Sequence, residues 1–146
     1  MKWSVLKFSE LDIQSLYDML QLRAEVFVVE QDCPYQDLDG KDAQSYHVCG
    51  YDENRLAAYA RIVEKGVSYS EISIGRVVVS PKHRGIRLGE QLMVESIRFI
   101  ESSLDAQPIR ISAQSHLRKF YNDLGFEFTG KEYLEDGIPH IEMLRK

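Results

Sequence analysis

The sequence has 146 residues, a mass of 16.9 kDa and a net charge of −5, with 44% hydrophobic and 28% charged residues. This length and composition predict a single globular domain spanning residues 1–146, and no apolar run approaches the roughly 20 residues that a membrane helix needs. The acidic balance argues against nucleic-acid or membrane partners, whose binding depends on clustered Lys and Arg.

Residues 3–8 alternate apolar and polar side chains, which predicts a first strand. The same N-terminal stretch lacks the cleavage site of a secretory signal, so a cytoplasmic location is expected. Apolar residues then recur at helical spacing from Ile13 to Phe27, and the β-branched residues after Arg23 predict a break or a change of face before Asp32.

Residues 32–44 contain Pro34 and Gly40 and predict a loop. A negative rim there could attract a cationic acceptor, although a solvated polar loop explains the same composition equally well. The spacing is not that of an EF-hand, no other metal-ligand pattern is present, and we expect no metal site. The carboxylates on or beside this loop are Glu30, Asp32, Asp37, Asp39 and Asp42.

The remaining elements alternate between strands and helices. Residues 45–51 and 56–63 predict a hairpin, residues 71–79 a central strand, and the apolar period from Gly85 to Leu104 a helix. A short strand at 109–113, a helix capped by Ser115 and ended by Gly125, and two strands within 126–145 follow. This order predicts an α/β fold: a mixed, mostly antiparallel sheet, one parallel β-α-β crossover over residues 71–113, and helices on both faces.

The stretch from Arg84 to Gly89 follows the central strand and opens the next helix. Gly85 and Gly89 let a ligand approach the backbone, and a helix N-terminus offers free N–H groups and a positive dipole end. The chemistry suits a pyrophosphate, although neither a Walker A loop nor a dinucleotide fingerprint is present. By itself this hexapeptide also fits a plain turn with solvated arginines.

Two coupled motifs give a resemblance. GRVVVSPKHRGIRLGEQLM, followed about three dozen residues later by FYNDLGF, resembles the GNAT superfamily of acyl-CoA-dependent N-acetyltransferases over about residues 71–128. LRAEVFVVEQDCPYQDLDGKD and EDGIPHIEM resemble the ElaA-like subfamily, so the likeness extends over most of the chain. One departure is Arg87, where the usual RGxGxG pattern has its middle glycine. Its side chain must point away from the pyrophosphate or contact it.

The resemblance implies acetyl-CoA as co-substrate and assigns roles to matching positions. Tyr121 falls at the general-acid position for the departing thiolate, although it also belongs to an apolar stripe with Leu117 and Leu124. Acetyl-CoA would be held by the strand residues Val77, Val78 and Val79, by the loop residues Arg84, Gly85, Ile86, Arg87, Leu88 and Gly89, and by Gln114.

The base is left open among three residues. Glu30 is the first choice because it matches the subfamily, and His47 and His140 are alternatives; each also has an ordinary structural explanation. Neither Cys33 nor Cys49 lies where a nucleophile is expected, so direct attack by an amine of a small molecule or peptide is predicted. A transferase for longer acyl-CoA or acyl-carrier thioesters and a non-catalytic CoA-binding module remain alternatives, and a homodimer is possible.

Overall fold

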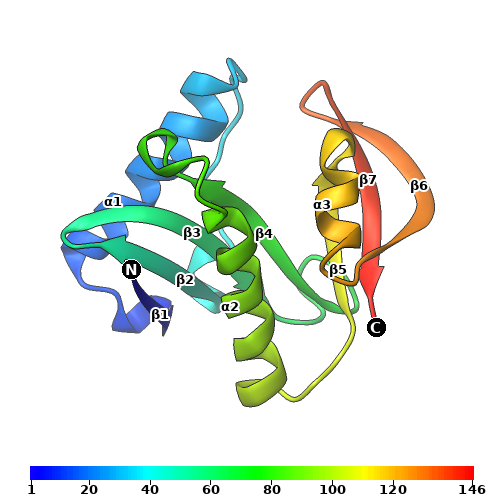
Figure 1. The fold of residues 1–146 in the computed structure, drawn as a ribbon, viewed down its shortest axis with the longest axis horizontal. Helices are drawn as coiled ribbons and strands as arrows, with labels where there is room; N and C mark the ends of the chain where they lie inside the picture. Colours follow the sequence, from blue (N-terminus) through cyan, green and yellow to red (C-terminus); the bar gives the residue numbers. More distant parts are fainter.

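The computed structural model describes all 146 residues, which form one seven-stranded sheet flanked by helices (Figure 1). The sheet order is β1-β2-β3-β4-β5-β7-β6, and β4–β5 is its parallel pair, all other pairs being antiparallel. The predicted mixed α/β fold with one crossover is therefore confirmed. The strands are β1 (Lys2–Lys7), β2 (Ser45–Asp52), β3 (Arg55–Val63), β4 (Ile72–Val79), β5 (Ile109–Gln114), β6 (Glu127–Glu135) and β7 (Ile138–Arg145).

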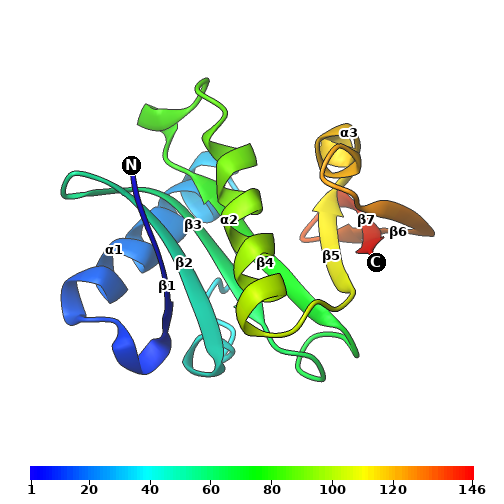
Figure 2. The same cartoon turned by 60° about the horizontal axis from the view of Figure 1, so that its bottom comes forward.

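Helices cover both faces of the sheet, as predicted, with α1 on one face and α2 on the other (Figure 2). None of them is long and apolar enough to cross a membrane. The larger core lies under α2 and α3, and a smaller one under α1. The helices are α1 (Ile13–Arg23), the π-helix η2 (Ala24–Glu30), α2 (Leu88–Ser103) and α3 (Arg118–Asn122), with the 3₁₀ turns η1 (Phe8–Glu10), η3 (Asp42–Gln44), η4 (Pro81–His83) and η5 (Ser115–Leu117).

The predicted change after Arg23 is a switch from α- to π-helix. The wider turn is marked by the N–H of Gln31 donating to the carbonyl of Val26 at 3.1 Å. A π-turn rotates the following residues relative to the α-helix. Phe27 and Gln31 lie beside the C-terminal half of β4.

A β-bulge bends β4 in the middle of the sheet. Tyr59 pairs with Val78 and Arg61 with Gly75, so β4 carries one more residue than β3 between these pairs. Arg76 lies in the bulge with φ 52°, and such a bulge bends its strand. β4 and β5 pair only near Ile72 and Ser73 and then diverge (Figure 1). The bend therefore exposes the β5-facing edge of β4 along its C-terminal half.

The helix predicted from Gly85 begins three residues later, at Leu88. Gly85 has φ 89° and Arg87 has φ 59°, and left-handed residues cannot continue a right-handed helix. The C-terminal hairpin is confirmed, with Asp136 and Gly137 both at positive φ as a type I′ turn requires. Both cysteines are buried free thiols.

Candidate functional site

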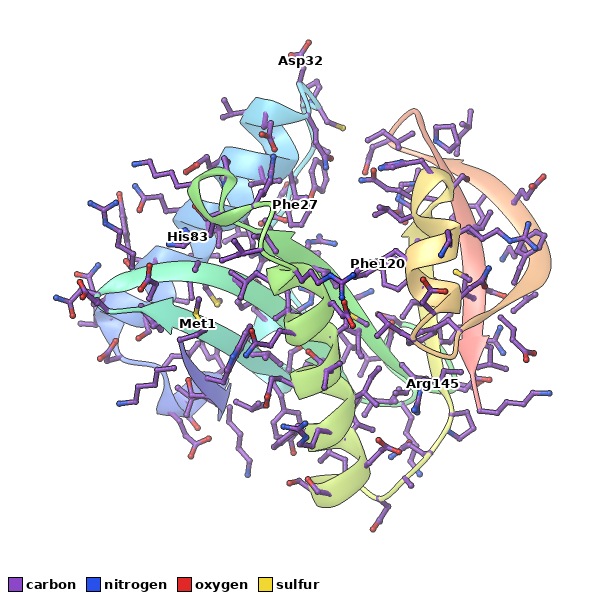
Figure 3. The ribbon with its side chains drawn as sticks, viewed as in Figure 1. Met1, Phe27, Asp32, His83, Phe120 and Arg145 are labelled. Atoms are coloured by element: carbon purple, nitrogen blue, oxygen red, sulfur yellow. The ribbon has the colours of Figure 1, made fainter.

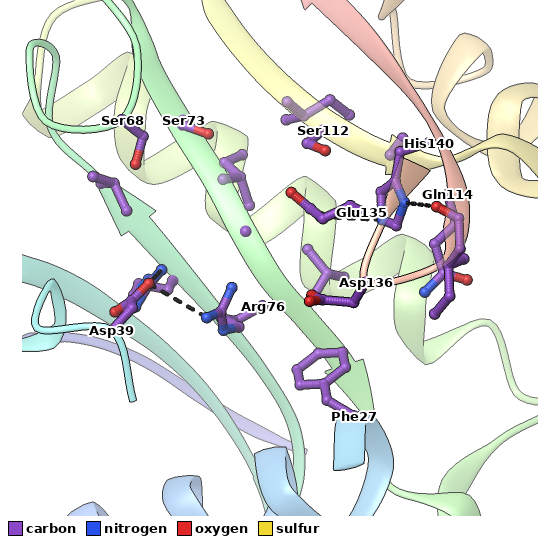
Figure 4. Close-up of a pocket in the computed structure, with 18 of the residues that line it drawn as sticks. Phe27, Asp39, Ser68, Ser73, Arg76, Ser112, Gln114, Glu135, Asp136 and His140 are labelled. Atoms are coloured by element: carbon purple, nitrogen blue, oxygen red, sulfur yellow. Dashed lines mark hydrogen bonds and ion pairs between the residues drawn. The ribbon is translucent and has the colours of Figure 1, made fainter. Parts of the chain in front are cut away.

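A cavity of about 470 Å³ lies where β4 and β5 diverge (Figure 4). Its walls come from segments far apart in the chain: the strands β4 and β5, helix α3, the loop before β2 and the β6–β7 turn. The loop and the turn meet where the Cys33 thiol donates to the carbonyl of Asp136 at 3.6 Å. The lining includes Phe27, Gln31, Tyr35, Asp39, Gly75, Arg76, Val77, Ser112, Gln114, Leu117, Tyr121, Glu135, Asp136 and His140.

Tyr121 is placed by α3 with its ring against the core and one side on the cavity. The residue is 7% exposed, and its ring packs edge-on against Phe120 and Phe126. Burial raises the pKa of Tyr121 to about 12. The phenol is therefore protonated at neutral pH, and since its hydroxyl makes no hydrogen bond within the chain, its proton is available to a ligand.

Of the other predicted acyl-CoA residues, Val77 and Gln114 share this cavity with Tyr121. The side chain of Val78 packs instead into the smaller core under α1, and that of Val79 packs against the larger core. Their backbone still belongs to the segment of β4 that has no pairing to β5. Val77 and Gln114 thus reach the cavity with their side chains, whereas Val78 and Val79 can contribute only backbone groups.

The loop from Arg84 to Gly89 leads from β4 into α2 and presents free donors. The backbone N–H groups of residues 84–90 have no acceptor within the chain, and Gln91, which donates to the carbonyl of Arg87 at 3.2 Å, is the first that does. The Arg87 side chain is 88% exposed, so it points away from the backbone and leaves these donors open. An anion fits this arrangement by charge and hydrogen bonding.

Gly89 lies where α2 meets α3. A Cβ there would be 3.8 Å from the ring of Phe120, which Figure 3 labels, and 3.8 Å from Val79, so side chains from two other elements frame the start of the helix. The donor loop therefore borders the same divergence of the sheet that holds Tyr121.

Glu30 does not line the cavity with Tyr121. Both of its carboxylate oxygens accept from Arg84, at 2.7 and 2.8 Å, and the two side chains are 42% and 45% exposed. The hydrogen bond from Arg84 lowers the pKa of Glu30 below its usual value. The structure thus places the predicted base against the predicted anion loop, where it is ionised and already engaged.

The two alternative histidines differ in position. His47 is fully buried, donates Nε2–H to the carbonyl of Asp42 at 2.9 Å and accepts from the Tyr59 hydroxyl at 2.6 Å. Burial lowers the pKa of His47 and favours its neutral form. It does not reach the cavity, whereas His140 lines it.

Three of the four aspartates of the acidic loop are paired with three arginines, whereas Asp32 is exposed and makes no ion pair. The separations run from 2.7 Å for Arg23–Asp42 to 3.3 Å for Arg76–Asp39. Arg23 comes from α1, and the other two arginines come from β3 and the β4 bulge, so the composition of the loop alone does not show this pairing. The members of this Asp–Arg cluster are Asp37, Asp39, Asp42, Arg23, Arg61 and Arg76.

Sequence reasoning also missed several cavity residues. Tyr35 and Arg76 lie on the loop side, and Glu135 and Asp136 on the turn side. The Asp136–Gly137 turn was predictable, but not that it faces a loop one hundred residues earlier. No local pattern carries that information, because the contact depends on how β7 inserts between β5 and β6.

A family model described as an acetyltransferase (GNAT) domain matches residues 13–146. Protein ElaA of Escherichia coli strain K12 is 44% identical over 99% of this chain and 96% of its own length. The crystal structure of E. coli ElaA superposes with a TM-score of 0.93 at 43% identity, and that of an acyl-CoA N-acyltransferase from Pseudomonas aeruginosa with 0.94 at 40%, each covering both chains fully.

A more distant structure shares only the fold. An aminoglycoside 6′-N-acetyltransferase complexed with coenzyme A has a TM-score of 0.75 at 15% identity, covering 99% of this chain and 96% of its own.

Proposed function

Because this chain belongs to the GNAT acetyltransferase family, in its ElaA-like subfamily, we propose that it transfers an acetyl group from acetyl-CoA to a primary amine. The family assigns acyl transfer from a CoA thioester. The observation that carries the finer proposal is that Tyr121, Val77 and Gln114 line one cavity at the divergence of β4 and β5. The amine belongs to a small molecule or a peptide.

The residues fit an acyl-CoA in two places. The unpaired edge of β4 offers N–H and C=O groups to the amides of the pantetheine arm, and the free N–H groups of residues 84–90 with Arg84 offer donors to the pyrophosphate. Acetyl-CoA supplies the activated thioester carbonyl. Within Val77 to Val79, the N–H groups that point away from β3 are the proposed donors for the oxyanion that forms on it.

The proposed chemistry is direct attack. The amine nitrogen forms a bond to the thioester carbonyl carbon, the C–S bond breaks, and the nitrogen releases one proton to solvent as the amide forms. The Tyr121 hydroxyl donates its proton to the departing sulfur and is reprotonated from solvent. No covalent enzyme intermediate is needed, since the buried Cys33 and Cys49 take no part; their free thiols also agree with a cytoplasmic location.

The test is Tyr121→Phe, with Tyr17→Phe on the exposed face of α1 as the matched control. We expect calorimetry to give acetyl-CoA affinities within about 3-fold of each other for the three proteins. Thiol release with a panel of small primary amines and peptide N-termini should fall about 100-fold in Tyr121→Phe only, the size of a general-acid contribution.

Full activity of Tyr121→Phe would contradict the acid assignment. Thiol release only from longer acyl-CoA or acyl-carrier thioesters would contradict acetyl specificity. Binding of acetyl-CoA without release from any pool would point to a CoA-binding module, and no binding would contradict both.

A further inference from the structure

His140 and Glu135 face one another in the wall of the cavity (Figure 4). His140 lies on β7 in register with Gln114 of β5, and Glu135 ends β6. The Nε2 atom of His140 is 3.3 Å from a carboxylate oxygen of Glu135. His140 is 7% exposed, whereas the Glu135 side chain is 53% exposed, so the pair extends from the cavity wall towards its mouth.

The other imidazole nitrogen fixes the tautomer of His140. Nδ1 is 2.7 Å from the carbonyl oxygen of Ile138. A carbonyl oxygen can only accept, so Nδ1 carries a hydrogen and donates it. In the neutral ring, Nε2 therefore holds a lone pair, and it is Nε2 that gains or loses the proton.

Whenever Nε2 of His140 carries no proton, its lone pair faces a carboxylate oxygen of Glu135 at 3.3 Å, and the chain places no donor between the two atoms. Two acceptors at this distance repel unless a donor bridges them. The bridge is either a proton on Nε2 or a ligand with more than one N–H. A primary ammonium has three N–H donors and the complementary charge, so it satisfies both acceptors at once.

We propose that Glu135 and His140 bind the ammonium form of the acceptor, and that Nε2 of His140 takes the proton that the amine must lose before it attacks. This inference rests on the proposed function and names the base that function requires. The N–H bond breaks, its electron pair stays on nitrogen as the attacking lone pair, and the proton moves to Nε2. The imidazolium then pairs with Glu135 and releases the proton to solvent at the open side of the pair.

The other groups around the ring are consistent with this role. The Tyr133 ring stacks on the imidazole with centroids 6.1 Å apart, and its hydroxyl is held by Ser112. Asp136 and Tyr121 line the same cavity. Glu135 is thus the one charged group in contact with Nε2, and the proposed acid and base share a single cavity with room for the acceptor.

The kinetic test uses His140→Gln, with n-butylamine as acceptor and CoA thiol release as the readout. Because general-base catalysis contributes about 10²–10⁴-fold, we expect kcat/KM for the amine to fall at least about 100-fold at pH 7 with acetyl-CoA affinity unchanged. The deficit should shrink towards pH 10, where more of the amine is already neutral in solution. Equal rates at pH 7, or a deficit that is constant with pH, would overturn the assignment.

Glu135→Gln separates binding from proton transfer. It keeps the base but removes the charge, so we expect a KM for n-butylamine raised about 5- to 10-fold with a smaller change in kcat. Glu132→Gln is the matched control, because it removes the same charge from an exposed position of β6 outside the cavity. An equal change of KM in both variants would refute a role for Glu135.

A binding readout does not depend on turnover. The chain has four histidines, and the His140→Gln spectrum identifies the His140 ring signal by NMR. We expect n-butylammonium, but not n-butanol, to shift that signal in the wild-type protein. The same response to both compounds, or to neither, would overturn the ammonium site whatever the effect of the variants on turnover. Absence of wild-type thiol release with any amine, alongside a specific shift, would instead contradict the proposed function.

Discussion

Two groups of charged residues border the cavity, and they differ in how their hydrogen bonds are satisfied. In the Asp–Arg cluster, each aspartate contacts two arginines and each arginine two aspartates. In the His140–Glu135 pair, the Nε2 atom of His140 is 3.3 Å from a carboxylate oxygen of Glu135. Every carboxylate of the first group is paired with arginines of the chain, and only the buried Nε of Arg61 has no acceptor, whereas the second group needs a proton on Nε2 or a donor from a ligand.

Burial makes pairing necessary in the Asp–Arg cluster. Arg23 is fully buried and Asp37 is 5% exposed, so their charges are tolerable only because they are paired. The cluster fixes residues 37–42 against β3 and the β4 bulge, and so builds one wall of the cavity. The pair on the opposite wall lines the cavity, and this position is the reason why we propose a catalytic role for it.

Arg23→Met should give the largest effect on stability, because it breaks the Asp–Arg cluster. It leaves Asp37 and Asp42 each short of one buried partner, and we expect a loss of about 3–5 kcal/mol in the free energy of unfolding. Urea denaturation measures it. Arg98→Met, which removes a 66% exposed arginine on α2, is the control and should change stability by less than about 1 kcal/mol. Similar losses for both variants would show that the cluster stabilises the fold no more than an exposed ion pair does.

Acid should weaken the same group. Burial raises the pKa of Asp39, but hydrogen bonds from Arg61 and the Lys41 N–H outweigh it, so the pKa of the folded state lies below the ordinary 3.8. The pKa of Asp42 is likewise lowered, mainly by Arg23 against the effect of burial. This stabilisation is complete above the unfolded-state pKa and is lost as the pH falls below about 4.

Thermal unfolding between pH 7 and pH 3 measures this loss. Asp39→Asn cannot titrate at this position, so its stability should be lower at pH 7 and should decline less steeply below pH 4. An identical slope for the variant and the wild type would contradict the contribution of Asp39.

Glu30→Gln tests an ion pair of a third kind, exposed and next to the anion loop. Removing the carboxylate frees Arg84 and takes a negative charge from the proposed pyrophosphate site. We expect acetyl-CoA to bind about 2- to 5-fold more tightly, a small effect because the ion pair is exposed, and the gain to fade at high salt. Calorimetry at two salt concentrations measures it. A fall of kcat by about 100-fold would assign the base role to Glu30 instead of His140.

Glu135→Gln should give the smallest effect on stability, and so it tests the difference between the His140–Glu135 pair and the Asp–Arg cluster. Its side chain is 53% exposed, and we expect a change in the free energy of unfolding within about 1 kcal/mol. Urea denaturation measures it beside Arg23→Met. A loss as large as that of Arg23→Met would mean that the pair is as structural as the cluster.

The family and most elements were predictable because they depend on local pattern. The GRVVVSPKHRGIRLG stretch identified the loop between β4 and α2, and the Asp136–Gly137 turn fixed the last hairpin. The start of α2 was predicted three residues early, because nothing in the pattern shows that Arg87 takes a left-handed conformation. That conformation is a physical reason for the glycine usual at this position, since only glycine adopts it without steric cost.

The sequence by itself determined the fold family, the order of elements and Tyr121 as a candidate acid, because periodicity and motifs are local properties of the chain. Only the tertiary structure decided which charges are free. Glu30 and its partner Arg84 are 54 residues apart, and the arginines that pair with the acidic loop come from three different elements. Pairing depends on distances in space. The sequence therefore could not show which carboxylates are paired with arginines and which one lies in the cavity where β4 and β5 diverge.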